Sequence, residues 1–227
     1  MVSTNKRYLS YLLDSNTPTY GNRNRFVCEK KSDISKGDVA NDSTVITTVH
    51  IGTHIDMPYH FFEEGQTIES FDIDYFSSEQ LLFIDLEPEG LIIKDDLITL
   101  LERIEHKSKY EFLIVKTGIC HQRDQEVFWR SNYGFDPSIA DYLRRAFPRI
   151  RIIGFDSISI SSFENRMLGR EAHRSFLDPK SPILILEDMD LTSLTPRSKI
   201  TRMEIVPLRI AQCDGLPCTV LAEVTIL

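Results

Sequence analysis

The chain has 227 residues, 41% of them hydrophobic, and its 34 acidic against 26 basic side chains give a formal net charge of -8. This length supports a large core and predicts a single domain over residues 1–227. The acidic excess argues against a nucleic-acid partner. Because no signal-peptide core follows Met1 and no apolar run approaches the roughly 20 residues of a membrane span, we expect a cytoplasmic protein without a membrane partner.

The first predicted strand covers residues 44–49 and leads into a segment rich in histidine. This segment reads His50-Ile-Gly-Thr-His54-Ile-Asp56-Met-Pro-Tyr-His60 and holds three of the six histidines in the chain. Neutral imidazole and carboxylate groups are the ligands that hold zinc- or manganese-like ions. The segment therefore predicts a metal site, and the alternative is a structural loop closed by hydrogen bonds.

The spacing of these residues restricts the backbone that could bring them together. On a helix, His50 and His54 would share one face, but Asp56 and His60 would point away from it. A straight strand would separate His50 from Asp56 by about 20 Å. The glycine and the proline inside the segment favour a chain that curls. We therefore predict that the strand ends in a ligand-bearing loop.

Strands and helices alternate through the rest of the chain. Buried strands are predicted from apolar runs at residues 81–86, 112–115, 150–153 and 183–186. Leucines at helical spacing predict a helix over residues 95–104. Asp136 and Pro137 are typical of a helix start and precede a helical pattern at residues 139–143. This alternation predicts an α/β fold.

The four cysteines show no spacing typical of a zinc knuckle or a redox motif. Cys213 and Cys218 could face each other across a hairpin, but a reducing cytosol argues against a stable disulfide. We expect free thiols.

The pattern His-x-Gly-Thr-His-x-Asp-x-Pro-x-His-Phe that begins at His50 resembles the signature of the cyclase-like metal hydrolases. That family includes bacterial kynurenine formamidase, isatin hydrolase and proteins described as cyclases. Further stretches that are similar to the family lie at residues 8–11, 18–21, 113–118, 153–160, 172–173, 185–191 and 207–217. The resemblance implies a swivelling β/β/α fold, with mixed β-structure and helices packed outside it.

The resemblance also implies roles for six residues. The implied metal ligands are His50, His54, Asp56, His173 and Glu187. Asp56 would bridge two ions, and His60 would be the catalytic acid and base. The step from His173 to Glu187 is longer than the family pattern, so Asp188 and Asp190 are the alternatives to Glu187. The cofactor would be one or two divalent ions, with zinc or manganese as the candidates.

Divalent ions activate water and polarise a carbonyl group, so the implied reaction is hydrolysis of an amide, lactam or ester, and cleavage of a C–N amide bond is expected first. An arylformamidase that converts N-formylkynurenine to kynurenine and formate is the first prediction. A lactam or lactone hydrolase of the same family and a non-catalytic metal-binding protein are the alternatives. The expected partner is a small amide, lactam or ester substrate, and the family implies a homodimer or homotetramer.

Overall fold

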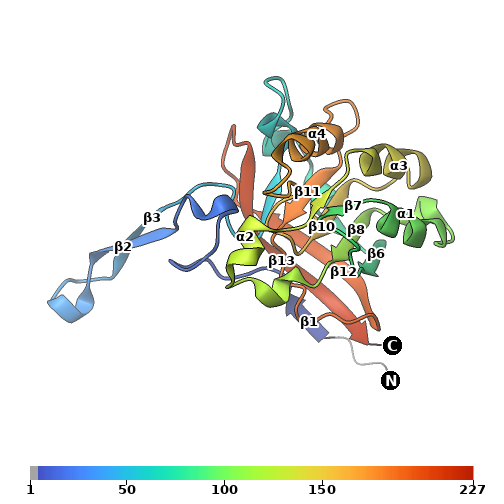
Figure 1. Ribbon diagram of the computed structural model, residues 1–227. Coiled ribbons are helices and arrows are strands. Elements are labelled where there is room, and N and C mark those ends of the chain that lie inside the picture. Colours follow the sequence, from blue (N-terminus) through green and yellow to red (C-terminus); the bar gives the residue numbers. More distant parts are fainter. Residues whose placement is uncertain (1–4, 227) are drawn as a thin grey trace.

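One mixed β-sheet forms the centre of the computed structural model, which describes residues 5–226 (Figure 1). Its strands run in the spatial order β5 (Ser77–Ser78), β12 (Ser198–Pro207), β13 (Gly215–Ile226), β4 (His54–Asp56), β11 (Leu184–Glu187), β10 (Ile152–Phe155), β8 (Phe112–Lys116) and β6 (Leu81–Asp85). A ninth strand, β1 (Asn5–Tyr8), pairs with β13. Because β6 also lies beside β12, the sheet is nearly closed.

The parallel strands β6, β8, β10 and β11 agree with the four predicted apolar runs within two residues at each end. All residues of β8, β10 and β11 are buried, as expected for strands covered on both faces. Glu187 is the last residue of β11 and is also buried. The apolar run before it therefore delivers a carboxylate to the edge of the core.

Helices pack outside this sheet (Figure 1). They are α1 (Asp95–Glu102), α2 (Glu126–Arg130), α3 (Ser138–Ala146) and α4 (Arg166–Phe176). The predicted start of α3 is confirmed within one residue. There, the Asp136 carboxylate accepts a hydrogen bond of 2.9 Å from the backbone N–H of Ser138. The predicted mixed β-structure with outer helices is thus confirmed. Among residues 5–226, none of the helices is long and apolar enough to cross a lipid bilayer.

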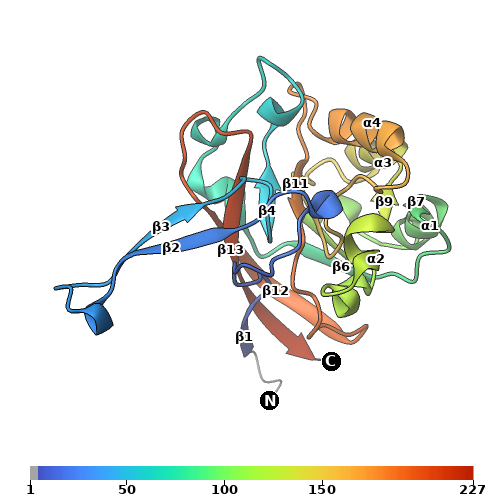
Figure 2. The ribbon, with the colours of Figure 1, turned by 60° about the vertical axis from the view of Figure 1, so that its left-hand side comes forward.

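Two short sheets lie apart from the central one. Strands β7 (Ile92–Ile93) and β9 (Gly134–Phe135) pair in parallel. Strands β2 (Val27–Ser32) and β3 (Asp42–Ile46) form an antiparallel hairpin that projects from the body of the molecule, and we call residues 27–46 the arm (Figure 2). Every residue of β3 is exposed, and so is all of β2 except Ser32.

Two predictions about this region were only partly correct. The strand predicted at residues 44–49 ends at Ile46, because it pairs only with β2 in the arm and has no further strand beside it. The predicted ligand loop is also only partly a loop, since His54 and Asp56 form β4. A strand of three residues is too short to show an alternating pattern, and its pairing partners come from the distant segments β11 and β13.

Candidate metal centre

Strand β4 fixes two of the predicted ligands. His54 and Asp56 are two residues apart, so their side chains project from the same face of the sheet. Glu187 of β11 is the register partner of His54, and Gly215 of β13 is the register partner of Asp56. A Cβ atom at Gly215 would lie 2.4 Å from the ring of His50. A glycine at this position therefore makes room for the imidazole of His50.

Helix α4 supplies His173 from the other side. Gly169, one turn earlier, packs so closely on Ser161 that a Cβ atom there would lie 1.8 Å from the Ser161 hydroxyl. This close approach sets α4 against the segment that follows β10. Ala172, His173 and Phe176 are buried on the same side of the helix.

Each of the two most buried histidines uses one ring nitrogen to fix its orientation. Nδ1 of His54 donates to the carbonyl of Gly52 at 2.8 Å, and Nδ1 of His173 donates to the carbonyl of Gly169 at 2.8 Å. In both rings, Nε2 is therefore the nitrogen that is available to the site. Backbone carbonyls often orient metal-binding histidines in this way.

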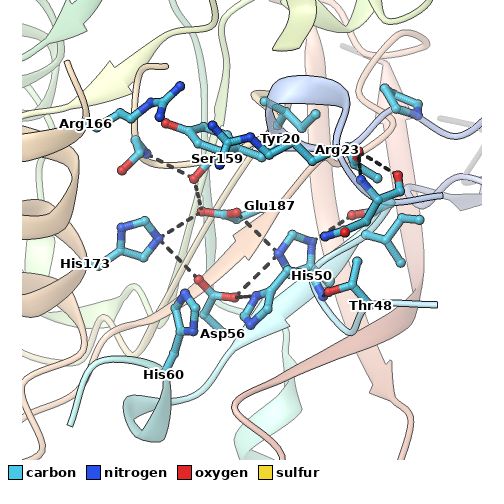
Figure 3. Close-up of a pocket in the computed structure, with 18 of the residues that line it drawn as sticks. Tyr20, Arg23, Thr48, His50, Asp56, His60, Ser159, Arg166, His173 and Glu187 are labelled. Carbon is cyan, nitrogen blue, oxygen red and sulfur yellow. Dashed lines mark hydrogen bonds and ion pairs between the residues drawn. The ribbon is translucent and has the colours of Figure 1, made fainter. Parts of the chain in front are cut away.

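Four side chains, His54, Asp56, His173 and Glu187, converge on one another at spacings longer than hydrogen bonds, and Figure 3 labels the last three. His54 Nε2 lies 3.3 Å from Glu187 Oε2 and 3.5 Å from Asp56 Oδ1. His173 Nε2 lies 3.5 Å from Asp56 Oδ2 and 3.8 Å from Glu187 Oε1. Ligands about 2.1 Å from one tetrahedral ion would lie about 3.4 Å from each other. The observed spacings are close to this value, and among the described residues two groups that include Asp56 have ligand atoms close enough together to hold one ion, namely His50, His54 and Asp56, and Asp56, His60 and His173.

Unsatisfied polar atoms support the same interpretation. His54 Nε2 and Asp56 Oδ2 are buried, and neither has a hydrogen-bond partner within residues 5–226. Buried polar atoms normally have a partner. The set of imidazole and carboxylate donors fits a divalent ion. The two oxygens of Asp56 face His54 and His173 respectively, which is the arrangement a bridging carboxylate requires.

His50 is placed differently from the other predicted ligands. Its Nδ1 lies 2.9 Å from Asp56 Oδ1, and its Nε2 lies 2.7 Å from Asp214 Oδ2. Burial lowers the pKa of His50, but the two carboxylates outweigh burial and raise this pKa to about 10. Both ring nitrogens of His50 thus face carboxylates. Its predicted role as a metal ligand requires one ring nitrogen to give up a carboxylate contact.

His60 stands at the end of a short 3-10 turn, Pro58–His60, beside the ring of His50. Its Nδ1 donates to Asp214 Oδ2 at 3.0 Å. Burial is the main cause that lowers the pKa of His60 from its ordinary value, so the ring is neutral near pH 7. A neutral imidazole next to the carboxylate cluster can accept a proton.

Asp214 is the main residue of the site to which the sequence analysis gave no role. Hydrogen bonds from His50 hold the pKa of its carboxyl well below the usual range, so it is ionised. Asp214 lies in the turn before β13, inside the tail segment that is similar to the family. The only sequence feature that could have drawn attention to it is the Asp-Gly pair at the start of that strand.

The alternatives to Glu187 face elsewhere. Asp188 makes a bidentate ion pair with Arg123, with contacts of 2.8 and 2.7 Å. Asp190 accepts a hydrogen bond from the Thr192 backbone N–H at 3.2 Å. Glu187 instead accepts from the backbone N–H of Ile160 at 2.7 Å, which directs its carboxylate into the cluster. The structure thus brings all six predicted residues together, while their individual roles stay predictions.

These residues lie at the floor of a pocket of about 400 Å³. Phe61 stacks on His173 with 4.6 Å between ring centroids, and Tyr20 and Arg166 line the opposite wall (Figure 3). A mixed β-sheet thus carries a buried cluster of imidazoles and carboxylates beneath an open pocket, and this cluster could hold a divalent ion.

Comparison with known proteins gives the family of the chain. The profile of the family described as "Putative cyclase" matches residues 8–162, and the chain belongs to this family. The matched range includes His50, His54, Asp56 and His60, whereas His173, Glu187 and Asp214 lie beyond it.

The similar sequences include kynurenine formamidases and cyclase-like proteins. Kynurenine formamidase of Geobacillus thermodenitrificans is 26% identical over 212 residues, which cover 92% of each chain. Cyclase-like protein 2 of Oryza sativa is 25% identical over 192 residues, and the match spans 82% of this chain but 66% of that protein. The chain therefore covers slightly less than two thirds of the plant protein.

Solved structures share the fold. Isatin hydrolase A from Labrenzia aggregata, bound to benzyl benzoate, superposes with a TM-score of 0.80 at 20% identity and covers 98% of this chain and 94% of that one. A potential metal-dependent hydrolase with cyclase activity gives a TM-score of 0.74 at 21% identity, covering 97% and 98%. The predicted cyclase-like fold is confirmed.

Proposed function

We propose that this protein is a metal-dependent hydrolase of the cytoplasm that cleaves a C–N amide bond in a small molecule. The observation that carries the proposal is the pair of buried, unpartnered atoms His54 Nε2 and Asp56 Oδ2 beside the neutral ring of His60. His50, His54, Asp56, His173 and Glu187 would hold one or two divalent ions. A bound ion of this kind lowers the pKa of a water ligand and polarises a carbonyl oxygen.

The residues of the chain would manage position and protons. His60 takes a proton from the attacking water and returns it to the departing nitrogen. Asp214 holds Nδ1 of His60, so Nε2 is the nitrogen that exchanges the proton. The aromatic ring of Phe61 shields one side of the cluster from bulk water through its stack on His173.

N-formylkynurenine is the first substrate that we propose, because the kynurenine formamidase of Geobacillus thermodenitrificans matches over 92% of both chains. The test is hydrolysis of N-formyl-L-kynurenine by purified protein that has been reconstituted with zinc or manganese, with a chelator-treated sample beside it. Chelator-sensitive turnover with a kcat/KM of about 10⁴ M⁻¹s⁻¹ or more supports arylformamidase activity. Absence of turnover in a protein with measured metal content contradicts it.

Opening of a lactam is the second candidate, and the superposition on isatin hydrolase A favours it. Isatin contains a strained cyclic amide, so the same water and proton chemistry would apply. Parallel assays with isatin and N-formyl-L-kynurenine separate the two candidates by their kcat/KM values. Activity toward neither substrate, in the metal-loaded protein, would favour a non-catalytic metal-binding protein.

The arm is where we propose that copies of this chain meet to form a homodimer or homotetramer. Isolated two-stranded hairpins are marginally stable in water. The arm nevertheless exposes large apolar side chains, namely Val27, Ile34, Val39, Val45 and Ile46. A second copy of the chain is the occupant we propose for these side chains.

A further inference from the structure

The wall of the pocket that faces the carboxylate cluster is basic. Arg23, Arg166 and Arg170 line the pocket together with Tyr20 (Figure 3). The chain as a whole has a formal net charge of -8. A local concentration of arginine in an acidic protein attracts anions to that place, because the field of nearby charges dominates inside a cleft.

Helix α4 carries two of these arginines and the candidate ligand His173 on one side. Arg166, Arg170 and His173 are spaced i, i+4 and i+7, so their side chains lie along the same face of the helix. A rise of 1.5 Å per residue puts Arg170 and Arg166 about 4.5 and 10.5 Å from His173 along the helix axis. The helix therefore sets a distance between the metal cluster and the positive charges.

Arg166 is held in position by neighbours that carry no charge. Its guanidinium carbon lies 3.9 Å from the centre of the Phe163 ring, and its Nε donates to the Phe163 carbonyl at 3.3 Å. The Phe163 ring is packed in turn against Tyr20, at 5.3 Å between centroids. These contacts with Phe163 fix the orientation of the half-buried Arg166 guanidinium. The N–H groups other than that of Nε take no part in the hydrogen bond to the Phe163 carbonyl.

Acidic partners for these arginines are absent from the described chain. Within residues 5–226, neither Arg166 nor Arg170 makes an ion pair with a carboxylate, whereas Arg123, which does not line the pocket, is matched by Asp188. A guanidinium has a forked set of donors that fits a carboxylate in bidentate fashion. An arginine that is oriented toward a pocket without an acidic partner can bind an anion supplied by the ligand.

We propose that the pocket binds substrates that carry a carboxylate several ångströms away from the scissile amide, and that Arg166, assisted by Arg170, binds this carboxylate. The inference rests on the proposed hydrolase function and adds the substrate class to it. The amide would lie over the cluster at His173, and the carboxylate would reach the first turn of α4.

The test compares two formamides of the same shape and different charge, 4-(formylamino)phenylacetate and its neutral carboxamide, by the release of formate. Wild-type protein loaded with zinc or manganese should prefer the carboxylate. Arg166→Gln should lower kcat/KM for the carboxylate by about ten- to a hundredfold, as expected for a lost hydrogen bond to a charged group, and change kcat/KM for the carboxamide less than twofold. Arg166→Lys should restore part of the loss.

Arg145→Gln is the matched control, since Arg145 is exposed on α3 and does not line the pocket. It removes the same charge and should leave both rates unchanged. Equal losses on the two substrates in Arg166→Gln would mean that Arg166 supports the structure only. An unchanged preference would overturn the proposal outright.

A binding measurement separates this proposal from the hydrolase function. If the metal-loaded protein releases formate from neither compound, the proposed function fails for this substrate class. Titration calorimetry with 4-aminophenylacetate and 4-aminophenylacetamide then still tests the carboxylate site. Tighter binding of the acid by wild type than by Arg166→Gln supports the site, and equal affinity for acid and amide contradicts it.

Discussion

The Asp214 carboxylate accepts a hydrogen bond from His60 Nδ1 at 3.0 Å, and the same oxygen lies 2.7 Å from Nε2 of His50. One carboxylate therefore orients both the proposed acid and base and a proposed metal ligand. A partner that orients a catalytic or metal-binding histidine typically contributes 10- to 100-fold in activity or metal affinity.

Asp214→Asn should therefore lower kcat by about 10- to 100-fold. The amide keeps the size of the side chain but removes the charge that fixes the two rings. Asp190→Asn, in an aspartate that faces Thr192 instead of the cluster, is the matched control. Elemental analysis of the metal content separates the two rings, because loss of metal indicates that His50 is affected and retained metal indicates that His60 is affected. An Asp214→Asn protein with wild-type kcat would rule out the positioning role.

His60→Ala should retain bound metal and lose a factor of roughly 10² to 10⁴ in kcat, the range for a general acid and base. His121→Ala serves as the comparison, because His121 is exposed and does not line the pocket. Both variants are measured for turnover and for metal content. A His60→Ala enzyme that hydrolyses as fast as wild type would show that another group moves the proton.

Asp56→Asn should strip the protein of metal, since the variant lacks the negative charge that faces both His54 and His173. In wild type, a metal at 100 times its dissociation constant should stabilise the fold by about 2.7 kcal/mol and raise the melting temperature. The variant should show no such rise. Full metal occupancy of Asp56→Asn by elemental analysis would exclude the bridging assignment.

Glu111 should stabilise the protein at neutral pH and cease to do so in acid. Burial raises the pKa of its carboxyl, but hydrogen bonds from Ser78 and Arg151, at 2.8 and 2.9 Å, outweigh burial and lower it below the ordinary value of 4.5. The lowered pKa means that this stabilisation is complete above pH 4.5 and is lost as the pH falls through the folded-state value. The expected contribution is about 1 kcal/mol.

Urea unfolding of Glu111→Gln at pH 7 and at pH 3 tests this dependence. The variant should be less stable than wild type at pH 7, and the difference in the free energy of unfolding should shrink at pH 3. Glu126→Gln is a suitable comparison, because Glu126 pairs with Arg130 on the exposed surface of α2. A difference that stays constant with pH would refute the role of the Glu111 charge.

We propose that wild type is a homodimer or homotetramer, and replacing residues 28–45 with a short Gly-Ser turn should then give single chains, with a mass somewhat below the 26.2 kDa of the full chain. The reason is that the deletion removes most of the exposed apolar side chains of the arm, which are the proposed contact with a second copy. Light scattering of wild type and variant gives the two masses. Equal oligomeric states in the two proteins would show that copies meet elsewhere.

The sequence predicted the elements whose side chains form simple patterns. Strands β8, β10 and β11 are buried and β6 is partly buried, and all four appear in the sequence as short, mostly apolar runs. The cluster residues were found because four of them lie within eleven positions and resemble a family signature. Such local signals need no knowledge of the fold.

Features that depend on distant segments were missed. Strand β4 exists because β11 and β13 pair with it from the other end of the chain. Helix α4 was not predicted, since much of its surface is polar and its close contact with Ser161 requires a glycine, which disfavours helix formation on its own. Asp214 approaches His60 across 154 positions, and no local pattern encodes that contact.

The arm joins the body through two segments that also line the pocket, residues 18–24 before β2 and residues 48–54 after β3. The arm contributes almost nothing to the buried core. Substitutions at its tip should therefore change the free energy of unfolding very little. In the proposed homodimer or homotetramer, a second copy bound at the arm would therefore act on both segments that connect the arm to the pocket. Because one of these segments contains His50 and His54, assembly and the candidate metal centre would be physically linked.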